Sequence, residues 1–190
     1  LDILARHPST ARFVATALVR RFVSDDPPAP LVDRAAERFR KTDGDLREVM
    51  RAILLSPEFL SPAAFDAKAK TPFEFVVSAL RQSGTDLTNA RPMVRALQEL
   101  GMPLYQCQPP TGYKDTADAW VHTGALVSRM NSALLMADGR LPGVTVPAST
   151  DAASLISGEV SDTTRATIAR AQTPPHAIAL ELGSPEFQRK

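Results

Sequence analysis

Apolar residues recur every three or four positions through much of the chain, which is the spacing of helices that bury one face. The first such segment opens at Ser9 and has apolar residues at Phe13, Val14, Ala17, Leu18 and Phe22. The same periodicity predicts eight helices in all, over residues 9–23, 29–40, 46–55, 72–82, 89–100, 116–137, 163–171 and 174–182. The longest of them is 116–137.

Helix starts and stops are marked by residues that favour those positions. Thr71-Pro72-Phe73-Glu74 predicts a start, with Thr as cap, Pro in the first turn and Glu at the third position. Gly101 suits the left-handed end of the preceding helix. No alternating run of five or more residues predicts a strand between the 16 prolines. The pattern therefore predicts an all-α fold: a compact, irregular multi-helix domain of about seven to eight helices joined by proline-rich turns.

One segment interrupts the helical pattern. Residues 141–148 contain three β-branched residues between prolines, which favours an extended chain. We therefore expect a main helical domain over 1–140, an extended linker over 141–162, and C-terminal helices over 163–190 that pack back on the main domain.

Composition and charge exclude several classes of protein. Of the 190 residues, 44% are hydrophobic and 23% charged, and 22 basic against 21 acidic residues give a net charge of +1. No basic block indicates nucleic-acid binding, and no apolar run reaches the ~18 residues of a membrane span. Cys107 is the only cysteine, so an internal disulfide is excluded. Because the chain starts without Met in the middle of a pattern, we expect it to be the C-terminal part of a longer protein, and its localisation stays open.

A short motif occurs twice. Ser56-Pro57-Glu58-Phe59 and Ser184-Pro185-Glu186-Phe187 each follow an apolar helix. Ser and Pro favour a new helical turn, and Glu is favourable near its N-terminus. Both copies predict a tight corner whose Phe packs into the core.

Several motifs together resemble one known family. His-Pro-Ser-Thr-Ala-Arg-Phe at 7–13 is one of them, and the others lie at 20–28, 39–46, 56–59, 71–76, 109–113 and 183–189. In these motifs the chain resembles the C-terminal half of a bacterial family, domain of unknown function 1800. The resemblance implies a helical fold, a bacterial source and a longer parent protein. It implies no activity and no catalytic residues.

The repeated corner supplies the candidate catalytic residues, Glu58 and Glu186. Two carboxylates facing one cleft are what a glycoside hydrolase needs. The alternative is that each Glu only complements a helix N-terminus. His7, His122 and His176 lack a second ligand at metal-binding spacing, so no metal site is predicted. The chain has no phosphate-binding glycine motif, and no cofactor is predicted.

The candidate ligand-binding residues are Tyr113, Trp120, Arg129 and Asn131. Tyr, Trp and Arg are the types that bind partners most strongly, and aromatic rings also suit sugar faces. The alternative is a Trp in the core and an Arg bound to a buried carboxylate or carbonyl.

Cap, corner and core signals dominate over any catalytic arrangement. We therefore expect a non-catalytic packing or interaction module. Its partner would be the N-terminal part of its own protein or another protein. The alternative is a hydrolase acting on carbohydrate through Glu58 and Glu186, with Tyr113 or Trp120 supporting the sugar.

Overall fold

The chain folds into two units, and each has its own hydrophobic core. The computed structural model describes residues 2–156 and 158–190. Unit 1 comprises residues 1–68 with Lys190, and unit 2 comprises Ala69–Arg189. Helices dominate both units, which confirms the predicted all-α class. None of the helices in the described residues is long and apolar enough to span a membrane.

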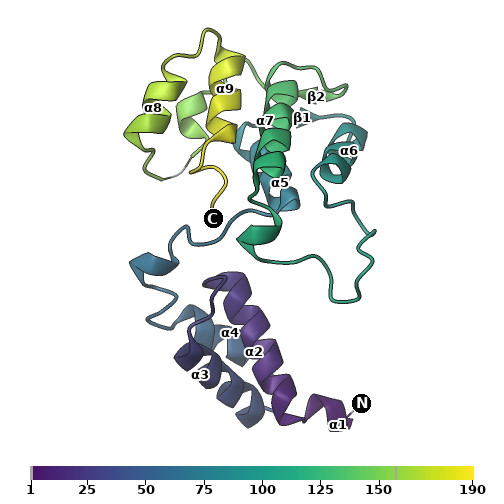
Figure 1. The fold of residues 1–190 in the computed structure, drawn as a ribbon, viewed down its shortest axis with the longest axis vertical. Helices are drawn as coiled ribbons and strands as arrows, with labels where there is room; N and C mark the ends of the chain where they lie inside the picture. Colours follow the sequence, from purple (N-terminus) through teal and green to yellow (C-terminus); the bar gives the residue numbers. More distant parts are fainter. Residues whose placement is uncertain (1, 157) are drawn as a thin grey trace. The chain divides into compact units, whose positions relative to one another are not determined.

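Unit 1 contains the short helix α1 and three longer helices, α2 to α4 (Figure 1). Its elements are α1 (Asp2–Ala5), α2 (Pro8–Phe22), α3 (Ala29–Lys41), α4 (Leu46–Leu54) and the 3₁₀ turn η1 (Pro62–Ala64). His7 caps α2, since its Nδ1 accepts a hydrogen bond from Ser9 N at 3.2 Å. Asp45 caps α4 by accepting from the backbone of Arg47 and Glu48.

The buried face of α2 differs from the predicted one. Small residues of α2 and α3 pack together: Ala11 and Ala15 are buried on α2, and Ala35 and Ala36 on α3. Phe13, predicted to be part of the apolar face, is 72% exposed. Alanine lets two helix backbones come close, whereas a Phe at the contact would hold them apart. Leu18 of the predicted set does pack against the core of unit 1. Periodicity alone does not weigh side-chain size, so it could not separate Leu18 from the exposed Phe13.

Unit 2 contains the remaining elements. They are α5 (Pro72–Gln82), β1 (Asp86–Leu87), α6 (Arg91–Glu99), η2 (Ala117–Ala119), α7 (Thr123–Ala137), β2 (Val144–Thr145), η3 (Ala152–Ser154), α8 (Asp162–Ile168) and α9 (Pro174–Gly183). The predicted capping box of α5 is present, with bonds in both directions between Thr71 and Glu74. In Figure 1, α7 lies beside α9, which is its principal packing partner.

The predicted helix 116–137 is interrupted. The structure has the turn η2, then a break at Trp120–His122, and α7 begins only at Thr123. His122 caps α7 at this break: its backbone is extended, and its Nδ1 accepts from Ala125 N at 3.3 Å.

The segment predicted to be a linker, 141–162, belongs to unit 2 and carries core residues. Val144 and Leu155 are both buried in it. β2 pairs antiparallel with β1 and forms a small two-stranded sheet that the sequence did not predict. Gly143 permits the close contact, since a Cβ there would lie 2.5 Å from Asn89 Cβ. The chain passes from unit 1 to unit 2 near residue 68.

Candidate functional site

Glu58, the first candidate carboxylate, lies in unit 1 and forms an ion pair. Its Oε2 accepts from Arg34 Nη2 of α3 at 2.6 Å. That hydrogen bond lowers the pKa of Glu58. The carboxylate therefore links the corner after α4 to α3.

Glu186, the second candidate carboxylate, lies in unit 2 and stabilises the start of α8. Its Oε1 accepts from Ser161 N at 3.0 Å, and its Oε2 accepts from Thr164 Oγ1 at 2.9 Å. Partial burial acts to raise the pKa of Glu186, but the hydrogen bonds from Ser161 and Thr164 outweigh it and lower the pKa to about 2. This carboxylate is ionised at neutral pH.

The two corners that carry these glutamates have the same local geometry. Phe59 N donates to Ser56 Oγ at 3.1 Å, and Phe187 N donates to Ser184 Oγ at 3.1 Å. Both Phe rings pack against a core, Phe59 partly buried in unit 1 and Phe187 fully buried in unit 2. The Ser-Pro-Glu-Phe motif is thus a corner motif in both places.

A third glutamate, Glu181 of α9, was not singled out by the sequence. It is 1% exposed, and its Oε1 has no hydrogen-bond partner among the described residues. Burial raises the pKa of Glu181, and the charges of Glu186 and Asp151 raise it further. Glu181 and Glu186 therefore form a pair of carboxylates whose pKa values are shifted in opposite directions.

The aromatic candidates lie together in the loop before α7. The rings of Tyr113 and Trp120 meet edge to face, with centroids 6.1 Å apart. Tyr113 donates its hydroxyl to Pro103 O at 2.6 Å, and Trp120 donates its indole N–H to Lys114 O at 2.8 Å. Desolvation raises the pKa of Tyr113. Both polar groups bind the backbone of their own loop.

Arg129 of α7 is buried in unit 2, whereas Asn131 is exposed to solvent. The Arg129 side chain donates to Gln188 Oε1 and to Lys70 O, each at 2.7 Å. Its guanidinium also lies over the Phe75 ring. Burial lowers the pKa of Arg129 to about 10, although the charge of Glu74 acts to raise it. Arg129 thus remains charged at neutral pH and joins the C-terminal segment to the start of α5.

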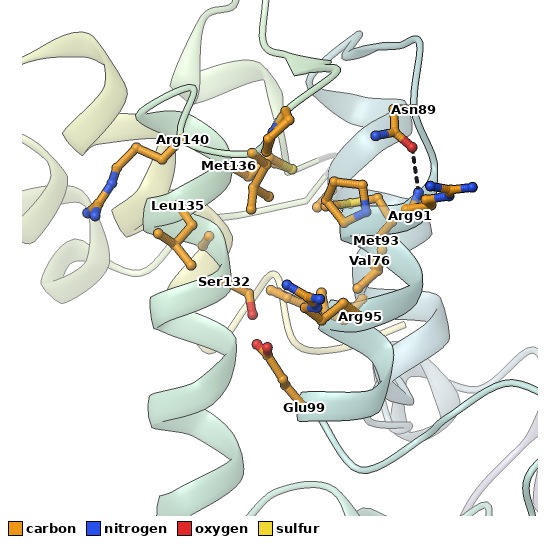
Figure 2. Close-up of a pocket in the computed structure, with 17 residues that line it drawn as sticks. Val76, Asn89, Arg91, Met93, Arg95, Glu99, Ser132, Leu135, Met136 and Arg140 are labelled. Atoms are coloured by element: carbon orange, nitrogen blue, oxygen red, sulfur yellow. Dashed lines mark hydrogen bonds between the residues drawn. The ribbon is translucent and has the colours of Figure 1, made fainter.

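The described residues also form a pocket in unit 2 that the sequence did not predict. It has a volume of about 460 Å³ and lies between α5, α6, α7 and the loop after α7. Its inner wall is apolar and includes Val76, Met93 and Met136. Figure 2 shows Arg95 and Glu99 of α6 turned toward Ser132 of α7, while Arg91 and Arg140 point outward at the rim. We call this cavity the α6–α7 pocket.

The sequence contained part of the signal for this pocket. Arg91 and Arg95 are one helical turn apart, so they share a face of α6. Like charges at this spacing are unfavourable in a helix, so the pair is a sequence signal for a functional surface. The opposite wall comes from residues 132–142, and nothing local brings that segment next to α6.

The described residues contain no group of three potential ligands that could hold a metal ion.

A family model described as protein of unknown function (DUF1800) matches residues 1–189. The chain belongs to the DUF1800 family. The resemblance inferred from the motifs is therefore confirmed over almost the whole chain. Searches of curated proteins and of solved structures found no match to this DUF1800 chain.

In this DUF1800 protein, Glu186 should make the stability of unit 2 depend on pH. Its pKa lies near 2 in the fold against an ordinary 4.5, so its contribution is full above about pH 5.5 and is lost as the pH falls toward 2. Glu186→Gln should cost about 1–2 kcal/mol at pH 7 after allowing for solvent screening. The difference from the wild type should shrink on acidification, as measured by urea unfolding at several pH values.

The exposed Glu159 provides the matched control for this measurement. Glu159→Gln should change the unfolding free energy by less than about 0.5 kcal/mol across the same pH range. A Glu186→Gln deficit that stays constant from pH 7 to pH 3 would contradict the assignment.

Proposed function

We propose that this protein acts as a non-catalytic interaction module, with the apolar surface of unit 1 as its contact surface. The supporting observation is that unit 1 exposes many large apolar side chains despite its small size. They are Ile3, Leu4, Phe13, Phe22, Leu46, Leu54, Leu55, Leu60 and Phe65. Exposed apolar side chains that cluster are a mark of protein-binding surfaces.

The positions of these side chains support two clusters. Thr10 Oγ1 donates to Leu4 O at 2.6 Å, which holds the backbone of Leu4 against the turn of α2 that precedes Phe13. Leu54 and Leu55 lie at the end of α4 and Leu60 follows in the adjoining corner. As the partner of the first cluster we propose a segment that lies N-terminal to this chain in a longer parent protein.

The binding test uses that N-terminal part, expressed as a separate chain, and the present chain as its partner. We expect association, and we expect Phe13→Ser to weaken it at least tenfold in calorimetric titration, because a buried Phe at an interface contributes strongly. The exposed Phe73 of α5 in unit 2 is the matched control, and Phe73→Ser should leave the affinity unchanged. Equal affinities for the wild type and Phe13→Ser would refute the proposed surface.

The hydrolase alternative is supported by one observation, the opposed pKa shifts of Glu181 and Glu186. Such a pair resembles the acid and base of a glycosidase. The same purified chain should nevertheless turn over no chromogenic glycoside or ester. Turnover that falls a hundredfold in Glu58→Gln, Glu181→Gln or Glu186→Gln, with helicity unchanged, would replace the interaction module by an enzyme.

A further inference from the structure

The rim of the α6–α7 pocket carries more positive than negative charge. Three arginines, Arg91, Arg95 and Arg140, line it together with one carboxylate, that of Glu99. In the part of the chain that the structure describes, none of the three arginines forms an ion pair within 4.0 Å. Two of them repel each other along α6, and Arg91 lies in the first turn, where the helix dipole disfavours a cation. An anion bound at this rim would offset both effects.

The inner wall of the pocket requires an apolar ligand body. The core residues Phe75, Met93, Ala133 and Met136 line it and are buried in the fold. A volume of about 460 Å³ lies in the range of small-molecule sites, which run from roughly 300 to 1,000 Å³. Methionines at positions 93 and 136 can adapt to a flexible chain.

Arg95 is the residue placed to bind a ligand head group. Figure 2 shows its side chain directed into the gap between α6 and α7, toward Ser132. A guanidinium offers two parallel N–H donors that match a carboxylate, and the Ser132 hydroxyl can donate a third hydrogen bond. Glu99 lies in the same gap and would repel an anion, so its charge provides an internal control.

We propose that the α6–α7 pocket binds an amphiphilic monocarboxylate, with the carboxylate at Arg95 and Ser132 and the alkyl chain over Met93 and Met136. An unesterified fatty acid with a chain of roughly ten carbons is the ligand class that fits this volume. The site lies in unit 2 and does not depend on the interaction surface proposed for unit 1.

The test is calorimetric titration of the whole chain with decanoate below its micellar concentration. We expect one site with a Kd on the order of 100 µM. Affinity should rise about threefold for each methylene added between octanoate and decanoate, because each buried methylene adds apolar contact. Decylamine, which carries the opposite charge, should not bind at this site.

Charge variants on α6 decide whether the head group is an anion. Arg95→Gln should weaken decanoate binding about tenfold, and Glu99→Gln should tighten it about twofold. Arg170→Gln removes the same charge from an exposed residue that does not line the pocket, and it should leave the Kd within about twofold. All three positions are exposed, so the variants should fold, which thermal unfolding checks.

Three results would overturn the proposal. Binding of several decanoate molecules with no effect of Arg95→Gln would mean that the chain absorbs decanoate as a detergent. Weakening by both Arg95→Gln and Glu99→Gln would mean that the site needs a zwitterion. No heat and no chemical-shift change on α6 or α7 at millimolar decanoate would mean that the pocket does not take this ligand.

Discussion

Arg129→Met is expected to lower the unfolding free energy of unit 2 by about 3 kcal/mol. The side chain is 1% exposed, and it supplies the donors for Gln188 Oε1 and Lys70 O. Methionine fills a similar volume but donates nothing, so two buried acceptors would lose their partners. A loss of this size lowers the melting temperature of a domain of this length by roughly 10 °C.

Urea unfolding followed by tryptophan fluorescence measures this effect in the right unit, since Trp120 is the only tryptophan and lies in unit 2. Arg165→Met is the matched control. Arg165 is an exposed residue of α8 with a surface ion pair to Asp162, so its replacement should cost less than about 0.5 kcal/mol. Arg129→Met and Arg165→Met variants of equal stability would rule out a structural role for the Arg129 contacts.

Phe187→Ala is expected to cost about 4 kcal/mol, as for a fully buried aromatic residue that leaves a cavity. The Phe187 ring meets the Phe75 ring edge to face, with centroids 5.9 Å apart. Lys70 Nζ lies 3.9 Å from the Phe187 ring centroid. Removing the ring therefore deletes an aromatic pair and a cation–π contact in the same core.

Phe59→Ala is the natural comparison, because Phe59 occupies the same place in the other Ser-Pro-Glu-Phe corner. Phe59 is only partly buried, so its removal should cost about 1–2 kcal/mol, as measured by far-UV circular dichroism in urea. An equal loss of unfolding free energy in the two variants would mean that the motif, and not the depth of burial of the ring, sets that loss.

Local signals explain why so much of the helical arrangement could be predicted. The capping box joins Thr71 to Glu74, and Asp45 caps α4 through the next turn of backbone. Both sets of hydrogen bonds join residues at most three positions apart, so a short stretch of sequence encodes them. The repeated corner is local in the same sense. The break before α7 is local too, but the hydrophobic period continues through His122 and does not show that this side chain caps α7.

The candidate site was less predictable, because its residues meet through long-range packing. Tyr113 and Trp120 do lie together, but their polar groups bind nearby carbonyls, and Asn131 faces solvent. The sequence paired Glu58 with Glu186, and the structure holds each within its own unit. The carboxylate that neighbours Glu186 electrostatically is Glu181, which looks in the sequence like any helical glutamate.

The sequence by itself determined the all-α class, most helix boundaries and the DUF1800 family, because caps, prolines and ungapped motifs act over a few residues. Only the tertiary structure decided which face of α2 is buried, where Arg129 bonds and where a pocket opens. The partners of Arg129 are each 59 residues away, and the α6–α7 pocket joins segments separated by more than thirty residues. Such contacts depend on how side chains of different size fit together across helices, and hydrophobic periodicity carries no information about that fit.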